Sequence, residues 1–305
     1  RPMNCPHHCE IYRSKPRSYK ELPVRLAEFG TVYRYEQSGE LHGLTRVRGF
    51  TQDDAHLFVR PDQLLEEFER VIDIVLYIFK TLKFDNYTAQ ISLRDPNNKE
   101  KYIGSDENWE KAESAIMQAA REKGLTTVVE LGEAAFYGPK LDIQYKNVYG
   151  KEDTLVTIQI DMLLAERFGM YYIDETGEKS LPYIIHRTSL GCYERTLAYL
   201  IEEYAGALPT WMMPEQVRFL PITDRAADYC RQQAELLRGQ SFRVEVDARN
   251  EKVGKKIREA TLEKIPYMLV VGDRDMEAGT VSVRTRTGED LGAMSLEAFS
   301  ALLTE

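Results

Sequence analysis

The sequence predicts an α+β protein in which an antiparallel β-sheet flanked by helices is followed by a small three-layer α/β domain. In the earlier part of the chain, long strand-like runs are joined by helical patterns over residues 62–82 and 107–123. After residue 216, strands and helices alternate, which is typical of a three-layer arrangement. Between these parts, Pro209 and Pro214 bracket a segment that can continue neither helix nor strand. We therefore expect two domains, residues 1–208 and 209–305.

Local patterns place the elements in chain order. Two β-rich runs around a polar, Gly-containing loop predict a hairpin over residues 31–57. A helical pattern over 191–206 precedes the proline-bracketed segment. Beyond it we expect strands at 217–222, 242–247, 267–272 and 279–286, and helices at 224–239, 250–264 and 295–303.

The composition is that of an ordinary folded protein. The 305 residues are 43% hydrophobic and 29% charged, which allows a sizeable core. The most apolar run, VIDIVLYIF, is far shorter than the ~20 residues that cross a membrane. Cysteines without paired spacing and the lack of a secretory signal at the start predict a cytoplasmic protein with no membrane partner. The net charge of -9 disfavours non-specific coating of nucleic acid, although residues 252–258 form a local basic run.

The second arm of the predicted hairpin carries an unusual mixture of side chains. Because side chains alternate faces along a strand, one face would carry the set Arg46, Arg48, Phe50, Gln52, Asp54 and His56. Arg34 and Glu36 project together from the first arm. A solvent-exposed face would also be polar. However, arginine can bind phosphate with two hydrogen bonds and phenylalanine can stack on a base, which favours a nucleotide lying on the sheet.

The first ten residues concentrate metal-binding side chains: Cys5, His7, His8 and Cys9. Structural zinc sites usually combine two such pairs, because four ligands must complete a tetrahedron. The chain has no second pair: the remaining cysteines and histidines, Cys192, Cys230, His42, His56 and His186, are scattered. A closed structural site is therefore not expected, and a bound metal would need ligands from distant parts of the chain.

Seven segments in order carry a resemblance that runs nearly end to end: RPMNCP, YRYEQSG, HGLTRVRGFTQDDAH, GEAAFYGPK, TIQID, IIHRTSLGCYERT and NEKVGKKIREATLEKIPYMLVVGDRD. Together they resemble the threonyl-tRNA synthetases, a family of class II aminoacyl-tRNA synthetases. The resemblance implies a class II catalytic domain over residues 1–208 and an anticodon-binding domain over 209–305. It also implies activation of L-threonine with ATP to threonyl-adenylate, and transfer of the threonyl group to tRNA(Thr).

The resemblance implies one zinc ion per chain, held by Cys5, His56 and His186. Three protein ligands with an open position are the pattern of a catalytic zinc. The threonine amino and hydroxyl groups would join the metal, with Asp54 accepting from the hydroxyl and Gln52 and Tyr137 near the amino group. A site that must satisfy a hydroxyl can reject valine by ~10⁴ or more, whereas serine keeps the hydroxyl. The neighbouring His7, His8 and Cys9 are not ligands in this family, and we expect local packing, polar contacts or solvent exposure for them.

The resemblance also assigns the nucleotide contacts. Arg34 would hold the α-phosphate and Arg46 the γ-phosphate, with Glu36 and Phe50 around the adenine and Mg²⁺ on the phosphates. Arg195 would cap the adenine and the γ-phosphate, and Arg34 and Arg195 would be catalytic because both steps develop negative charge. Without the resemblance, Arg195 would be expected to form an ion pair on a helix surface with Glu194 or another neighbour. Lys140 is a less favoured candidate for the substrate site.

In the second domain, the resemblance assigns anticodon reading to Asn250, Asp275 and Arg284. Splayed single-stranded bases require such exposed hydrogen-bonding side chains.

Several features depart from the family pattern. The first class II motif, which forms much of the dimer interface, the N-terminal editing region and a histidine proposed to assist acyl transfer would all lie upstream of Arg1. Asp153 and Thr154 replace a common Trp–Gln pair, Cys192 replaces a common serine, and Asp275 stands where a glutamate can occur. We therefore expect a homodimer when the first motif is present, and weak or no activity from the 305-residue piece alone.

Two functions remain open at this point. The first is a threonine–tRNA ligase core, supported by the joint presence of the zinc ligands and the arginines. The second is a non-catalytic tRNA-binding or regulatory paralogue, favoured only by the missing first motif. A generic zinc hydrolase is a distant third possibility, because it would need a general base near the metal and would not use the arginines.

Overall fold

The computed structural model describes residues 1–304 and confirms the predicted α+β fold. The chain divides into a unit Arg1–Glu202 and a second unit that begins at Glu203. This division falls at the end of helix α5 (Tyr193–Glu203), a few residues before the predicted boundary at residue 208. Within residues 1–304, no helix has both the length and the apolar character needed to cross a membrane.

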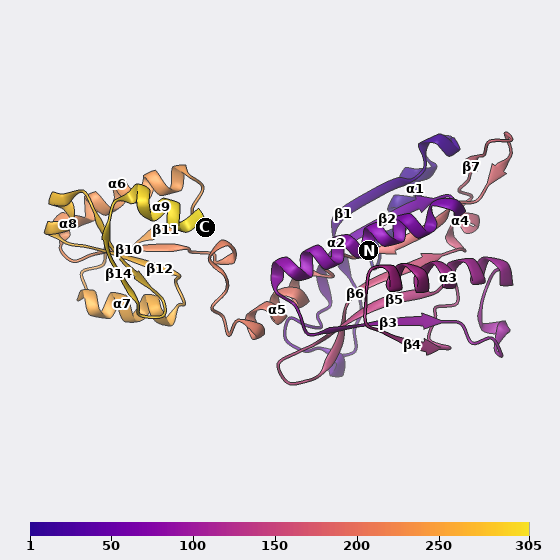
Figure 1. Ribbon diagram of the computed structural model, residues 1–305, viewed down its shortest axis with the longest axis horizontal. Coiled ribbons are helices and arrows are strands. Elements are labelled where there is room, and N and C mark those ends of the chain that lie inside the picture. Colours follow the sequence, from indigo (N-terminus) through magenta and orange to yellow (C-terminus); the bar gives the residue numbers. More distant parts are fainter. Residues whose placement is uncertain (305) are drawn as a thin grey trace. The chain divides into compact units, whose positions relative to one another are not determined.

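A single sheet forms the centre of the first unit, with the strand order β1-β2-β9-β6-β5-β3-β4 (Figure 1). Its strands are β1 (Val24–Tyr33), β2 (Gly49–Val59), β9 (Tyr183–Arg187), β6 (Glu152–Asp161), β5 (Lys140–Lys146), β3 (Tyr87–Leu93) and β4 (Thr127–Leu131). Neighbouring strands are antiparallel except for the parallel pair β3–β4. The late strand β9 lies between β2 and β6, and its register places His186 directly opposite His56. Residues far apart in the sequence are thereby brought to one place on the sheet.

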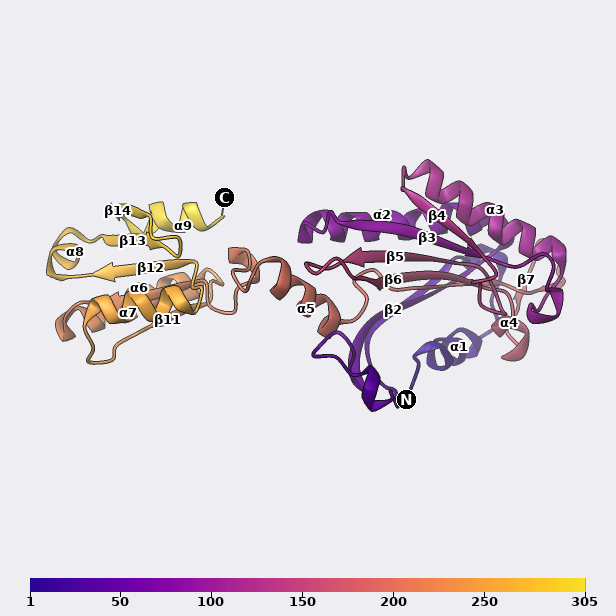
Figure 2. The ribbon, with the colours of Figure 1, turned by 90° about the horizontal axis from the view of Figure 1, so that it is seen from below.

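Helices cover both faces of this sheet (Figure 2). Helices α2 (Leu64–Leu82) and α3 (Asp106–Glu122) lie along one face, close to the predicted ranges. Helix α1 (Cys5–Arg13) lies on the other face, where Tyr12 stacks on Phe58 of β2 with ring centroids 4.4 Å apart. Along β2, Phe50, Gln52, Asp54, His56 and Phe58 share a face, so the polar residues of this strand point to the side that α1 occupies. The short elements α4 (Leu164–Arg167), β7 (Tyr172–Ile173) and β8 (Lys179–Ser180) lie between β6 and β9 in the sequence.

The predicted hairpin forms, but its first arm ends earlier than expected, before Arg34 and Glu36, and its second arm starts later. Strands β1 and β2 pair from Val24–Phe58 to Tyr33–Gly49, and residues 34–48 form a long tip that includes the 3-10 turn Ser38–Glu40. Arg46 and Arg48 therefore belong to the tip, and the prediction that they continue the strand face of Phe50 is wrong. Arg48 lies over the ring of Tyr35 at 5.1 Å and donates to the carbonyl of Glu36. The polar, Gly-containing tip folds back through a bridge between His42 and Arg46 instead of extending as strand.

The second unit is a three-layer α/β structure with the strand order β11-β10-β12-β13-β14. Its strands are β10 (Val217–Pro221), β11 (Val244–Val246), β12 (Tyr267–Val271), β13 (Val281–Thr285) and β14 (Asp290–Met294), and its helices are α6 (Asp224–Gly239), α7 (Val253–Leu262), α8 (Asp273–Ala278) and α9 (Leu296–Thr304). Helices α6 and α9 pack on one face of the sheet around Phe219 and Phe299, and α7 packs on the other around Leu220 and Ala260.

Two short elements of this unit were not predicted. Helix α8 and strand β14 have only six and five residues, too few for a clear periodic pattern. Gly279 ends α8 in a left-handed conformation with φ 67°, so the residues before β13 close a helix instead of extending the strand.

Gly138 is a position where the fold has no room for a side chain. A Cβ at this residue would lie 1.8 Å from the carbonyl oxygen of Ile160 on β6. We expect Gly138→Ala to lower the free energy of unfolding of the first unit by roughly 1–3 kcal/mol, because the loop that carries Tyr137 must move away from β6. Denaturant unfolding followed by the fluorescence of buried Trp109, with Trp211→Phe in every variant, measures this change.

Gly39→Ala is the matched control for this experiment, because a Cβ there would meet nothing within 4 Å. Equal unfolding midpoints for the two alanine variants would contradict the expectation.

Candidate active site

Cys5, His56 and His186 meet on the α1 side of the sheet. They come from the start of α1, from β2 and from β9, and their ligand atoms all lie within 4.8 Å of one another. The two imidazole rings stand nearly perpendicular, with centroids 4.6 Å apart, and Cys5 Sγ lies 3.6 Å from His186 Nδ1. Among residues 1–304, these three form the one group of histidine, cysteine and acidic side chains whose spacing could hold a metal ion.

The side chains of this cluster fit a zinc ion. His56 is fully buried, and its Nε2 has no hydrogen-bond partner, which is costly unless something else satisfies the atom. Burial, together with the neighbouring His186 and His8, lowers the pKa of His56 to about 2, so the ring is neutral and has a free lone pair. One sulfur and two imidazole nitrogens are ligands that zinc prefers, and three protein ligands leave a position open.

Each histidine of the cluster has a further contact through the ring nitrogen that faces away from the candidate metal position. His186 Nε2 lies 3.1 Å from Asp161 Oδ2, and His56 Nδ1 lies 2.7 Å from His8 Nδ1. Although burial acts in the opposite direction, the hydrogen bonds to Asp161 and Cys5 raise the pKa of His186. Burial lowers the pKa of His8, whose Nε2 lies 3.5 Å from Glu28 Oε1.

The residues next to Cys5 differ in their surroundings. His7 is exposed, whereas His8 and Cys9 are buried. Burial raises the pKa of the Cys9 thiol to about 12, which disfavours the thiolate form that binds metal. Thus Cys9 packs as an apolar residue, and His8 makes a polar contact with His56.

A cavity of about 440 Å³ opens beside the cluster. Its lining includes Cys5 and His186 together with the residues predicted to contact threonine, Gln52, Asp54 and Tyr137. Asp54 is buried and accepts a 3.0 Å hydrogen bond from Asn4 Nδ2, and burial raises the pKa of its carboxyl. The Tyr137 hydroxyl donates to Gln159 Oε1 at 2.9 Å. The cavity therefore presents fixed polar groups next to the candidate metal ligands.

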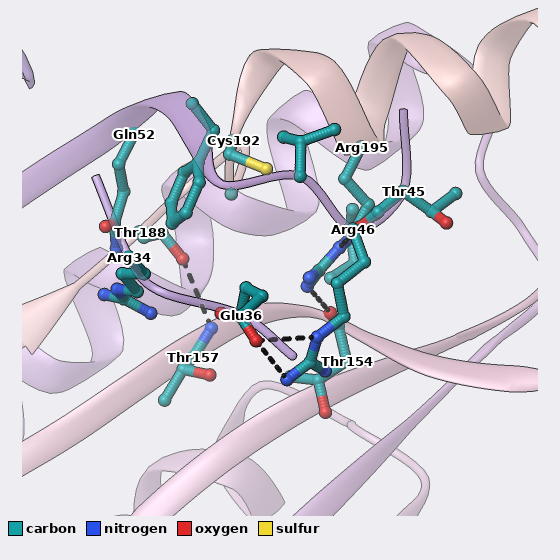
Figure 3. A pocket seen from close by; sticks show the side chains of 14 residues that line it. Arg34, Glu36, Thr45, Arg46, Gln52, Thr154, Thr157, Thr188, Cys192 and Arg195 are labelled. Atoms are coloured by element: carbon teal, nitrogen blue, oxygen red, sulfur yellow. Dashed lines mark hydrogen bonds and ion pairs between the residues drawn. The ribbon is translucent and has the colours of Figure 1, made fainter. Parts of the chain in front are cut away.

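A second cavity, of about 240 Å³, lies between the hairpin tip and α5 (Figure 3). Every residue predicted to contact ATP lines it: Arg34, Glu36, Arg46, Phe50 and Arg195. The guanidinium of Arg34 lies 5.2 Å from the centre of the Phe50 ring, and Arg46 forms an ion pair with Glu36 at 3.1 Å. The cavity thus combines cations with an aromatic ring, which suits a nucleotide.

Arg195 is fixed by the backbone and not by its neighbour Glu194. Its Nε donates to the carbonyl of Thr45 at 2.9 Å, and its Nη1 donates to the carbonyl of Thr154 at 2.7 Å. Glu194 instead accepts from the backbone N–H of Thr51 on β2 at 3.0 Å. These contacts tie α5 to the hairpin tip and to β6 and hold the Arg195 guanidinium at the cavity wall, as Figure 3 shows.

The two cavities share part of one wall. Arg34, Gln52, Thr157 and Thr188 line both of them. The Nε of Arg34 donates to the carbonyl of Pro2 at 3.1 Å, which holds the side chain at this boundary. Arg34 can therefore contact molecules in both cavities at the point where they approach each other.

The less favoured candidate Lys140 and the positions that depart from the family pattern differ in their contacts. Lys140 lines neither cavity, and its ammonium group binds Asp142 Oδ2 at 2.6 Å. Thr154 and Cys192 both line the smaller cavity, whereas the Asp153 carboxylate accepts from the Tyr199 hydroxyl at 2.9 Å. The departures at Thr154 and Cys192 therefore alter the cavity wall itself.

In the second unit, the structure places Asn250, Asp275 and Arg284 on two parts of the surface. Exposed Asn250 follows β11, and Asp275 follows β12, so both lie beyond the carboxyl ends of the parallel strands. Asp275 accepts from the backbone of Gly272 and from the hydroxyl of Ser282, each at 2.9 Å. Arg284 lies two residues after Ser282 on β13 and pairs with Asp290 at 3.1 Å. Asp275 thus stabilises the start of α8, whereas the side chain of exposed Asn250 makes no hydrogen bond to another described residue.

Several residues of this site were not predicted. Asn4 holds Asp54, Asp161 holds His186, and His8 holds His56. His8 could have been found, because residues three apart on a helix share a face and Cys5 lies three positions earlier. Nothing in the local sequence around Asp161 or Asn4 indicates their distant partners.

Comparisons with known proteins extend over the whole chain. A family model described as the tRNA synthetase class II core domain (G, H, P, S and T) matches residues 1–204, and an anticodon-binding domain model matches residues 216–305. A threonine–tRNA ligase from Cytophaga hutchinsonii is 58% identical over 98% of this chain and 46% of its own length. One from Porphyromonas gingivalis is 57% identical over 99% of this chain and 46% of its own length. The chain therefore spans about half the length of the curated relatives it matches.

A solved structure has the same fold throughout. It is described as the RNA binding domain of threonyl-tRNA synthetase from Cryptosporidium parvum Iowa II, with a TM-score of 0.92 and 35% sequence identity. The match covers 100% of this chain and 76% of that chain.

Proposed function

This chain belongs to the threonyl-tRNA synthetases, a family of class II aminoacyl-tRNA synthetases, and on that premise we propose that the protein activates L-threonine with ATP and transfers it to tRNA(Thr). The observation that carries this proposal is the pair of cavities that meet at Arg34. One cavity borders the cluster of Cys5, His56 and His186, and the other has the cationic and aromatic lining of a nucleotide site. The threonyl-adenylate would form where the two meet.

In this proposal, Cys5, His56 and His186 hold one Zn²⁺ per chain. The metal, when bound, would supply a Lewis acid with an open position for the threonine amino and hydroxyl groups. Asp54 would accept from the hydroxyl with the oxygen that Asn4 does not use. Valine lacks this hydroxyl and would leave the second carboxylate oxygen of buried Asp54 without a hydrogen bond, which disfavours valine binding. Gln52 and Tyr137 would face the amino group from the same cavity.

In the smaller cavity, Arg34, Arg46 and Arg195 would neutralise the phosphates of ATP, with Mg²⁺ bound to those phosphates. Glu36 and Phe50 would border the adenine. The position of Arg34 at the shared wall suits the α-phosphate, which the threonine carboxylate must attack. A cation fixed there would stabilise the charge that develops during both steps.

The second unit would bind the anticodon of tRNA(Thr) through Asn250, Asp275 and Arg284. Among these residues, Asn250 is exposed and lies just before the basic run at 252–258. We expect Asn250→Ala to weaken tRNA(Thr) binding by about 0.5–1.5 kcal/mol, roughly 2- to 12-fold, because a neutral hydrogen bond to a base is lost.

Filter binding with the tRNA(Thr) transcript measures this change. The control variant is Asn147→Ala, in the first unit, and an equal loss for both variants would contradict a role for Asn250 in reading the anticodon. Threonine-dependent pyrophosphate exchange, which does not involve tRNA, should be unaffected by Asn250→Ala.

We further propose a cytoplasmic protein that acts as a homodimer. A non-catalytic tRNA-binding or regulatory paralogue is the alternative function. Threonine-dependent exchange between ATP and pyrophosphate, measured on the 305-residue chain and on a full-length version, separates the two. We expect exchange from the full-length version and weak or no exchange from the 305-residue chain. No exchange from either would refute the ligase proposal.

A further inference from the structure

His8 is buried behind His56, on the side away from the other candidate metal ligands. Its side chain is 5% exposed, and its Nδ1 lies 2.7 Å from His56 Nδ1. The two rings meet edge to face with centroids 4.8 Å apart. The other nitrogen of His56, Nε2, is the buried atom that has no hydrogen-bond partner. His8 and the candidate metal position are therefore on opposite nitrogens of one ring, so His8 cannot itself be a ligand at Nε2.

The close contact between two ring nitrogens restricts where the hydrogens are. At 2.7 Å one nitrogen must donate and the other must accept. If His8 donated, the single hydrogen of the neutral His56 ring would be on Nε2, as a buried N–H without an acceptor. If His56 donates from Nδ1, its Nε2 keeps a lone pair, and the hydrogen of His8 is on Nε2, facing Glu28 Oε1 at 3.5 Å. The second arrangement avoids a buried N–H without an acceptor on His56 and turns the N–H of His8 toward the Glu28 carboxylate.

We propose that His8 is a positioning residue of the metal centre, which accepts a hydrogen bond from His56 Nδ1 and so directs the Nε2 lone pair toward Cys5 and His186. Glu28 in turn orients His8 from the protein surface. This inference rests on the proposed zinc function of the site.

Two observations support the view that neighbouring side chains orient the candidate metal ligands. Asp161 holds His186 in the corresponding way, through the nitrogen that faces away from Cys5. In addition, Cys5 and His8 are on the same face of α1, so one helix would supply both a ligand and the partner of another ligand. Partners of this kind typically change metal affinity by 10- to 100-fold when they are removed.

The test compares two substitutions of His8 in the 305-residue chain. Leucine has a similar size and cannot accept a hydrogen bond, whereas the Oδ1 of asparagine can take the place of Nδ1. Zn²⁺ affinity is measured by competition with a chromophoric chelator, and Co²⁺ is used as a spectroscopic probe of the ligand geometry. We expect His8→Leu to bind Zn²⁺ roughly 10- to 100-fold more weakly and to show an altered Co²⁺ spectrum. His8→Asn should recover most of the Zn²⁺ affinity and of the original Co²⁺ spectrum. The exposed neighbour supplies a matched control, His7→Leu, which should leave both unchanged.

The outcomes separate this inference from the proposed function. An unsubstituted chain that binds neither Zn²⁺ nor Co²⁺ would overturn the zinc proposal, and this inference with it. Metal binding by the unsubstituted chain with equal affinity and spectrum in His8→Leu would overturn this inference alone. If His8→Leu does not fold, Glu28→Met removes the outer partner of His8 at the surface. Weaker Zn²⁺ binding in that variant supports the relay, and unchanged binding overturns it.

Discussion

Zinc is expected to be lost from the chain, together with threonine activation, when His56 is replaced by alanine. His56 is fully buried between His8 and His186, and its unpartnered Nε2 is the atom best placed to bind a metal. Without it, only Cys5 and His186 remain, and two ligands hold zinc poorly. We expect less than stoichiometric zinc after dialysis, measured by elemental analysis. In a full-length version we expect threonine-dependent exchange to fall by ~10⁴-fold or more, because recognition of the hydroxyl is lost.

The control for this experiment is His7→Ala, which removes an exposed imidazole from α1. This variant should keep its zinc and its activity. A His56→Ala variant that retained one tightly bound zinc per chain would show that the metal is held elsewhere.

The second large effect is expected for Arg34→Ala. Arg34 lines both cavities, and its guanidinium is held by Pro2 and by the ring of Phe50. Removing one preorganised group that stabilises developing charge typically costs ~10²–10³ in rate. We expect a loss of that size in pyrophosphate exchange by a full-length version, with zinc content unchanged.

Arg48→Ala is the matched control for Arg34→Ala. Arg48 is also an exposed arginine of the hairpin tip, but it lies over Tyr35 and lines neither cavity. A small effect of Arg48→Ala beside a large effect of Arg34→Ala would support the proposed position of the α-phosphate. Equal losses would contradict it and would indicate a general contribution of positive charge.

The fold was predictable where local pattern and final structure agree. The apolar periodicity of α2 reflects burial on one side of the helix, which the sequence records directly. The alternation of polar and small or apolar residues along β2 from Phe50 onward also distinguished its two faces, although Asp53–Val59 are buried on both of them. The prediction that Arg46 and Arg48 continue the strand face of Phe50 was wrong. The point at which a strand ends depends on the strand it pairs with, and β1 ends at Tyr33, opposite Gly49. Helix α8 was missed because its six residues are too few for a clear periodic pattern, although the hydrogen bond from the Gly272 N–H to Asp275 at its start is local.

The candidate site was predictable only in part, for a related reason. Composition and spacing excluded a closed zinc site at residues 5–9, and the choice of Cys5, His56 and His186 came from family resemblance. The sheet order explains why spacing could not make that choice: β9 lies next to β2, although His186 follows His56 by more than a hundred residues. Asp161, which orients His186, becomes visible only when the strands are assembled, whereas the spacing of His8 from Cys5 on one helix face could have indicated His8.

The wall that the two cavities share has a consequence for inhibitor design. A compound that joins a threonine-like head to a nucleoside-like tail through a short neutral linker could occupy both cavities past Arg34. Once the head is bound, the tail experiences an effective concentration in the ~mM range, so weak fragments can combine into a tight bivalent ligand. The translational and rotational entropy of association is then lost once for the joined compound, and not once for each fragment.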